Sequence, residues 1–153
     1  MNGRSSAEAV LLAMGLVSLA LVLGALGFQY LGGLKPCEMC HWQRWPHIAA
    51  AILGIGGFVA ARDRAPVLAW VVVVLIAISG LIGVYQTGMQ WHLLPGPSAC
   101  SVAHAYVMGS NAPVEVRCDV PTWFFLGLAL PAWNAIFSLL IAGTSALMLA
   151  RRA

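Results

Sequence analysis

Charged side chains are scarce in this sequence. Its 153 residues include only five acidic and eight basic side chains, and 61% of all residues are apolar. A soluble domain is typically about 25% charged, so these few charges could not cover the surface that a folded chain of this length exposes to water. The net charge of +3 is small and dispersed, which excludes the basic stripe of a nucleic-acid-binding protein. The composition therefore predicts a single membrane domain over residues 1–153.

Four long runs of uncharged residues divide the chain. A helix needs about 20 residues to cross a hydrocarbon core of about 30 Å, and we expect transmembrane helices at about residues 9–31, 45–61, 65–87 and 123–149. The second helix is short, because its 17 residues extend only about 25 Å. The predicted fold class is therefore all-α, a bundle of four transmembrane helices connected on one side by loops at about 32–44 and 88–122.

Three residues within these runs have consequences for packing. Pro131 lies inside the fourth run, where a kink is tolerable if neighbouring helices satisfy the freed carbonyl. Asn134 follows it and needs a hydrogen-bonding partner within the bundle. His47 lies in the second run and is expected to form hydrogen bonds between helices.

The basic residues indicate which side of the membrane each loop occupies. Five arginines flank the side of the two termini, namely Arg4, Arg62, Arg64, Arg151 and Arg152, against Lys35, Arg44 and Arg117 on the opposite side. Cytoplasmic loops carry the excess of positive charge, so both termini are expected in the cytoplasm. All four cysteines then lie in the two loops on the other side, in an oxidising compartment where thiols tend to pair.

The segment from Cys37 to His41 carries the most chemical information. The spacing Cys37-x-x-Cys40 suits a disulfide, a shared zinc ion or, with His41 directly after it, covalent attachment of a c-type haem. The external loops are too short to wrap a haem. Zinc sites with four thiolates usually consist of two close pairs, whereas Cys100 and Cys118 are separated by 17 residues, a spacing that favours a loop-closing disulfide. The cysteines could form inert structural disulfides or a dithiol that exchanges with other thiols. Four cysteines allow three disulfide connectivities.

Arg44 stands just before the second apolar run. At the membrane interface it could extend toward lipid phosphate, or it could offer its forked donors to a ligand beside Cys40. Electrons that leave a dithiol next to the lipid phase need a lipid-soluble acceptor, and a quinone meets this requirement. A strongly oxidising dithiol protein, with a reduction potential of roughly −120 mV, can be regenerated only by an acceptor whose reduction potential is more positive.

Three blocks of residues resemble a known family over nearly the whole chain. The first block is Lys35-Pro36-Cys37-x-x-Cys40-x-x-Gln43-Arg44, and the second is Leu94-Pro95-Gly96-Pro97-Ser98-Ala99-Cys100. The third comprises Cys118, Trp123-Phe124-Phe125-Leu126-Gly127-Leu128 and Pro131-x-Trp133-Asn134. In this order on four helices, they resemble the bacterial disulfide bond formation protein B (DsbB) family of membrane thiol:quinone oxidoreductases.

The resemblance implies a function and the residues that perform it. A reduced periplasmic thioredoxin-fold oxidase of the DsbA type would attack Cys100, and electrons would pass from Cys100 and Cys118 to Cys37 and Cys40, by way of a transient bridge between Cys37 and Cys118. The acceptor would be a membrane quinone, ubiquinone or menaquinone, close to Cys40 and assisted by Arg44. No metal is expected. The implied location is the bacterial inner membrane, with the redox cysteines facing the periplasm.

The chain departs from the family pattern near the end of the third helix. Many relatives carry a histidine soon after the tyrosine that ends this helix, where this chain has Tyr85-Gln86-Thr87. A histidine contact to quinone therefore cannot be transferred, and Gln86 is expected to donate a hydrogen bond instead. His41, like Gln86, is a candidate for quinone binding.

Overall fold

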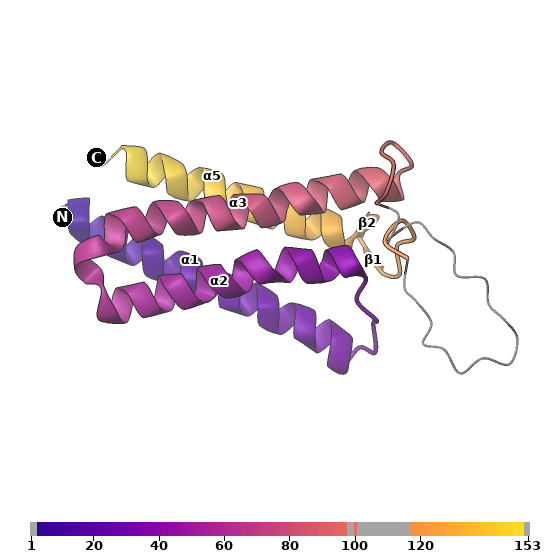
Figure 1. Ribbon diagram of the computed structural model, residues 1–153, viewed down its shortest axis with the longest axis horizontal. Helices are drawn as coiled ribbons and strands as arrows, with labels where there is room; N and C mark the ends of the chain where they lie inside the picture. The colour runs from indigo at the N-terminus through magenta and orange to yellow at the C-terminus, as the bar shows by residue number, and fades with distance from the viewer. Residues whose placement is uncertain (1–2, 98–99, 101–116, 152–153) are drawn as a thin grey trace, which may run out of the picture.

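The computed structural model describes residues 3–97, 100 and 117–151. Within these residues, four long helices form a bundle (Figure 1): α1 (Gly3–Tyr30), α2 (Glu38–Ala60), α3 (Ala65–Gln90) and α5 (Leu130–Ala150). A short 3-10 helix, η1 (Arg62–Arg64), joins α2 to α3. The first turn of α1 and the last turn of α5 lie at the same end of the bundle, as expected for an even number of passes (Figure 1).

Three of the described helical segments are long and apolar enough to cross a membrane. They are Ser5–Tyr30, Arg62–Gln90 and Leu130–Ala150. Large apolar side chains on the outer faces are exposed, among them Leu23, Val59, Val67, Val74 and Leu140. Their exposure to water would be unfavourable, so the bundle presents a surface suited to lipid.

Helix α2 begins earlier than the apolar run predicts. Its first residue is Glu38, inside the segment 32–44 that the sequence analysis assigns to a loop. The Cys37 side chain accepts a hydrogen bond from the backbone N–H of Cys40 and so caps the helix, which explains the early start. With 23 residues the helix is about 34 Å long, because it includes residues that precede the short apolar run.

A short hairpin replaces the first part of the fourth predicted helix, so the described fold is not purely helical. Strands β1 (Phe124–Phe125) and β2 (Leu128–Ala129) pair antiparallel. Leu126 and Gly127 at the turn have φ values of 50° and 79°, the left-handed backbone of a type I′ turn, which glycine adopts readily. Helix α5 then starts at Leu130 with Pro131 in its first turn, where a missing N–H costs nothing. Pro131 therefore lies at the start of the helix and not inside it, so no freed carbonyl needs a partner.

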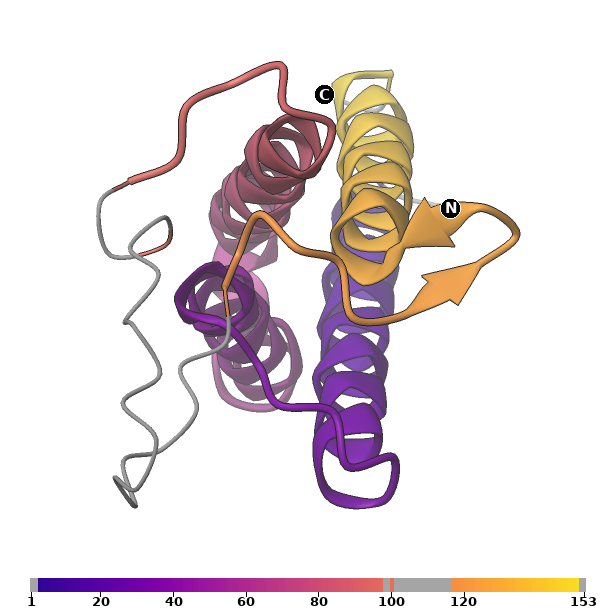
Figure 2. The same ribbon diagram turned by 90° about the vertical axis from the view of Figure 1, so that its right-hand side faces the viewer.

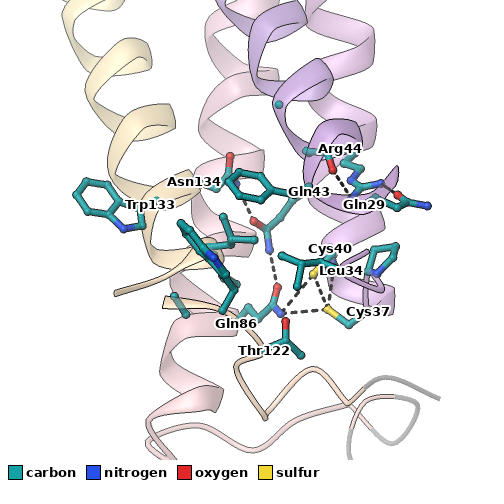
Figure 3. Close-up of a pocket in the computed structure, with 18 of the residues that line it drawn as sticks. Gln29, Leu34, Cys37, Cys40, Gln43, Arg44, Gln86, Thr122, Trp133 and Asn134 are labelled. Carbon is teal, nitrogen blue, oxygen red and sulfur yellow. Dashed lines mark hydrogen bonds between the residues drawn. The ribbon is translucent and has the colours of Figure 1, made fainter. Parts of the chain in front are cut away.

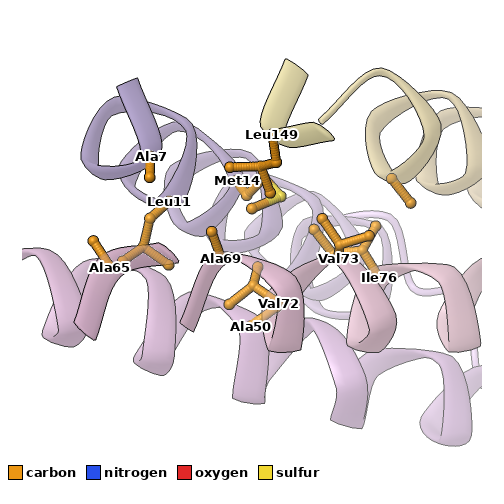
Figure 4. Close-up of a cluster of buried hydrophobic side chains, with 11 residues drawn as sticks. Ala7, Leu11, Met14, Ala50, Ala65, Ala69, Val72, Val73, Ile76 and Leu149 are labelled. Carbon is orange, nitrogen blue, oxygen red and sulfur yellow. The ribbon is translucent and has the colours of Figure 1, made fainter. Parts of the chain in front are cut away.

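Small residues bring the helices close together. A methyl group added at Gly54 of α2 would lie 2.6 Å from the Cα atom of Gly15 in α1, so the two backbones are in contact. A hydrophobic core fills the half of the bundle near the termini (Figure 4); its buried members are Ala7, Leu11, Met14, Ala50, Ala65, Ala69, Val72, Val73, Ile76, Ala142 and Leu149. The other half of the bundle holds the cysteines and the buried amide side chains of Gln43 and Gln86.

Viewed from the end that carries the cysteines, the four helices lie around a common centre (Figure 2). Helices α2 and α3 lie on one side, and α1 and α5 lie on the other. Helix α5 packs mainly against α3, and α1 packs mainly against α2, whereas α1 and α5 contact each other little. The seam between α1 and α5 is therefore the loosest part of the bundle. Most of the predicted loop 88–122 lies outside the described residues.

Candidate redox site

Cys37 and Cys40 lie together at the start of α2. Their Sγ atoms are 2.7 Å apart, only slightly farther than the about 2.05 Å of a disulfide bond. Both are free thiols in this structure; Cys37 is buried and Cys40 is half-buried. The helical turn between them sets this distance, so little movement separates the dithiol from the disulfide.

The two thiols differ in pKa. The pKa of Cys40 is lowered to about 6, first because its sulfur accepts a hydrogen bond from the Cys37 thiol; the nearby Arg44 charge contributes less. The pKa of Cys37 is raised, because its thiol is the donor in this contact and because it is buried. Both residues precede the apolar run of α2. The Arg44 charge also favours the ionised form of Cys40.

We expect Cys40 of the reduced protein to react with iodoacetamide at an unusually low pH. Alkylation requires the thiolate, so a pKa of about 6 makes the rate rise through about pH 5–7 and level off above, where an ordinary thiol with a pKa near 8.5 would still be slow. The Cys37→Ala substitution removes the hydrogen-bond donor and should move the midpoint to higher pH. Peptide mass spectrometry after timed alkylation measures both midpoints. A midpoint above pH 8 with Cys37 intact would contradict the assignment.

The second cysteine pair is joined. Cys100 and Cys118 form a disulfide, and both are fully buried. They belong to one buried cluster with Cys37, packed together with Met39 and Met89. The structure therefore brings all four predicted cysteines together at one end of the bundle, although residues 101–116 between the second pair are not described.

Gln86 connects the two pairs. Its Nε2 atom donates to Cys37 Sγ at 3.1 Å and lies 3.8 Å from Cys40 Sγ and 3.4 Å from the backbone oxygen of Cys118. Its Oε1 atom accepts a hydrogen bond of 2.6 Å from Gln43 (Figure 3). The side chain predicted to bind quinone is thus engaged with the cysteines in this structure.

A polar network runs from Gln43 into the bundle. Asn134 Nδ2 donates to Gln43 Oε1 at 2.8 Å and to Ser79 Oγ at 3.1 Å. His47 Nε2 lies 3.2 Å from Asn134 Oδ1 and 3.1 Å from Ser138 Oγ. The expected hydrogen bonding of His47 and Asn134 between helices is confirmed.

A cavity of about 320 Å³ lies beside the cysteines, within the size range of small-molecule sites. Its walls come mainly from α1, the start of α2 and the start of α5. Cys37, Cys40, Arg44 and Gln86 line it (Figure 3). His41 is exposed and does not belong to its lining.

Arg44 reaches from α2 to α1 along the wall of this cavity. One guanidinium nitrogen donates to Gln29 Oε1 and another donates to the backbone oxygen of Ala25 at 3.3 Å. Both acceptors are uncharged, so no carboxylate in these contacts neutralises the guanidinium. The cavity therefore has one cationic wall close to Cys40.

An aromatic row lines the opposite wall. Phe28 contacts Trp123 with ring centroids 5.0 Å apart, and the row continues through Phe125 and Trp133 to Phe137. All of these except Phe125 line the cavity. The row joins the end of α1 to the start of α5, so the cavity extends along the loose seam between these helices.

Several cavity residues are missed by the sequence analysis. Gln29 and Phe137 come from apolar runs in which the sequence gives no sign of which face points inward. Gln43 and Trp133 are noticed only as parts of motifs, and His47 and Asn134 only as residues that form hydrogen bonds between helices. Among the described residues, no group of three or more histidine, cysteine, aspartate or glutamate side chains could hold a metal ion.

The fold and the site together define a multi-pass helical membrane protein with two adjacent cysteine pairs. Residues 7–148 match the family described as "Disulfide bond formation protein DsbB", and the chain belongs to this family. Membership assigns an oxidoreductase activity in disulfide bond formation. It lends no support to a haem carrier or to an inert scaffold.

Several relatives carry the name Disulfide bond formation protein B. The relative from Cupriavidus metallidurans is 29% identical, with 97% of this chain and 96% of the relative covered. The relative from Burkholderia ambifaria is 31% identical over 94% of this chain and 90% of its own length, and that from Aromatoleum aromaticum is 28% identical over 87% and 89%. No solved structure shows a significant match to the chain.

Proposed function

We propose that the chain is a thiol:quinone oxidoreductase. It takes electrons from a periplasmic DsbA-like dithiol protein through Cys100 and Cys118, passes them to Cys37 and Cys40, and delivers them to ubiquinone or menaquinone. The single observation that carries the proposal is the cavity that Cys40 and Arg44 share, next to a buried cluster with the second disulfide.

The proposed relay consists of thiol–disulfide exchanges that balance. The partner thiolate attacks Cys100 and releases the Cys118 thiolate, which attacks Cys37 of the Cys37–Cys40 disulfide and releases the Cys40 thiolate. The second partner thiol then displaces Cys100, giving the oxidised partner. Cys100 next attacks Cys118, which restores the Cys100–Cys118 disulfide and releases Cys37.

The last step returns Cys37 and Cys40 to a disulfide, and two electrons and two protons pass to the quinone substrate. The pairing in the structure, with Cys100 and Cys118 joined and Cys37 and Cys40 free, corresponds to the stage before this step. The short distance between the two free sulfurs supports their closure into a disulfide.

The cavity suits a quinone in three respects. Apolar and aromatic side chains form most of its lining, as a planar ring requires. The Arg44 guanidinium is a donor for a quinone carbonyl oxygen. The loose seam between α1 and α5 offers an apolar tail a route into lipid. His41, being exposed, would act only if the quinone approached from outside the cavity.

We further propose the orientation expected from the sequence. Helix α2 would be the fourth membrane-spanning helix, since it packs along α1 and α3 and is long enough. Arg62, Arg64 and Arg151 lie at the end of the bundle that holds the termini, which favours that end for the cytoplasm. The cysteines would then face the periplasm from the inner membrane.

Turnover of the purified protein tests the proposal. The protein in detergent is mixed with a reduced thioredoxin-fold dithiol protein of the DsbA type and a short-chain ubiquinone or menaquinone, and quinone absorbance is followed. We expect quinone reduction that depends on the dithiol protein and no haem Soret band. A Soret band without dithiol-dependent quinone reduction would refute the proposal and favour haem at Cys37, Cys40 and His41.

Replacing Arg44 should weaken the use of quinone. Arg44→Met removes the cationic donor beside Cys40, and we expect the KM for quinone to rise about ten- to a hundredfold, the effect of losing one or two charge-assisted hydrogen bonds. Steady-state kinetics at varied quinone concentration measures this change. Arg44→Lys keeps a cationic donor and should raise the KM for quinone less than Arg44→Met does. Arg62→Met, at the opposite end of the bundle, serves as the control. An unchanged KM in Arg44→Met would remove Arg44 from the quinone site.

A further inference from the structure

Two glutamines of α3 hold the backbone of Cys118. Gln86 and Gln90 are one helical turn apart and therefore share a face of the helix. Their Nε2 atoms each lie 3.4 Å from the backbone oxygen of Cys118. We refer to these two side chains as the amide clamp.

The amide clamp also contacts the first cysteine pair. The Gln86 Nε2 atom carries two hydrogens, and its two nearest acceptors are Cys37 Sγ at 3.1 Å and the Cys118 oxygen at 3.4 Å. Gln43 donates to Gln86 Oε1 and so fixes which side of the amide faces the cysteines. One amide group therefore joins a sulfur of one pair to the main chain of the other.

The side chain of Gln90 is only partly satisfied by hydrogen bonds within the described residues. Its Oε1 atom is buried and has no hydrogen-bond partner among the described residues. A buried acceptor without a partner destabilises a fold, and the hydrogen-bonding capacity of this side chain is not fully used within the described residues. What Gln90 does contribute is the hydrogen bond to Cys118.

We propose that Gln86 and Gln90 are positioning residues that hold Cys118 against Cys37 for exchange between the two pairs. The inference rests on the proposed function, in which Cys118 attacks Cys37. In that step the Cys118 thiolate forms a bond to Cys37 Sγ, the Cys37–Cys40 bond breaks, and its electron pair leaves on Cys40. The clamp selects Cys37 as the target, because Gln86 lies closer to Cys37 Sγ than to Cys40 Sγ.

The equilibrium of the bridge between Cys37 and Cys118 tests the clamp directly. In the Cys40→Ser/Cys100→Ser double variant only these two cysteines remain. The detergent-solubilised protein is equilibrated with mixtures of reduced and oxidised glutathione, quenched with a maleimide reagent, and the bridged fraction is read by mass. We expect Gln86→Met and Gln90→Met, added singly, to lower the equilibrium constant for the bridge about tenfold each.

A control and a second variant keep the result interpretable. Thr87→Val changes a buried neighbour whose hydroxyl donates to Gly83 in its own helix, and it should leave the bridge unchanged. Gln86→Met also deprives Gln43 of a partner, so if that variant does not accumulate, Gln90→Met decides alone. Equal bridge formation in the parent and in the glutamine variants would overturn the proposal, as would an equal loss in Thr87→Val.

The assay separates this inference from the proposed function. Bridge formation needs neither quinone nor the partner protein, so a wild-type protein that fails to reduce quinone would refute the oxidoreductase while the bridge still reports on the clamp. In the protein with all four cysteines, the clamp variants should lower kcat with the dithiol protein.

Discussion

Cys40→Ser is expected to abolish quinone reduction, by at least about a thousandfold. A serine hydroxyl neither ionises near neutral pH nor forms a disulfide. Without Cys40, Cys37 cannot be oxidised to the disulfide that delivers two electrons to quinone. Cys40 also has the lowered pKa and lies nearest the Arg44 charge, which makes it the sulfur best prepared for this role. Quinone absorbance in the presence of reduced dithiol protein measures the loss.

The same variant should keep its exchange with the dithiol protein. Cys100 and Cys118 remain paired in it, so a mixed disulfide with the partner should still form and be visible on a non-reducing gel. Trp42→Phe, at an exposed position two residues after Cys40 in α2, is the matched control and should turn over normally. Quinone reduction at the normal rate in Cys40→Ser would refute the relay.

Asn134→Leu is expected to destabilise the bundle more than any other single change to the polar network. Asn134 is the only described side chain in hydrogen-bonding contact with Gln43, His47 and Ser79 together. Leucine leaves Gln43 Oε1 without its donor, whereas His47 and Ser79 each lose one of their contacts. A buried group without a partner costs about 1–3 kcal/mol in soluble proteins, and hydrogen bonds between membrane helices are worth less, so we expect the free energy of unfolding to fall by about 1–3 kcal/mol.

Unfolding of the detergent-solubilised protein by sodium dodecyl sulfate, followed by circular dichroism, measures this change. Thr144→Val on the same helix is the control, because the Thr144 hydroxyl donates to backbone oxygens of its own helix and faces outward. Its stability should match that of the parent. If Asn134→Leu were as stable as Thr144→Val, the network would not hold α2, α3 and α5 together.

Hydropathy predicted the existence of the long helices but not all of their ends. The apolar runs place α1, α3 and α5 nearly correctly, because a helix that crosses a membrane needs about 20 consecutive, mostly apolar residues. The start of α2 was missed, since Glu38 to Arg44 is polar and only the cap by Cys37 explains its helical conformation. The hairpin before α5 was missed as well, because Phe124, Phe125 and Leu128 are as compatible with an apolar helix as with strands.

The sequence by itself determined the class of protein and its chemistry. Too few charges for water, long apolar runs and four cysteines in ordered motifs leave few alternatives, since each of these is a property of residue type and spacing. Only the tertiary structure decided which side chains meet. The approach of Gln86 and Gln90 to Cys118, the crossing of Arg44 to α1 and the partners of His47 depend on how helices far apart in the chain rotate and pack, which no local pattern specifies.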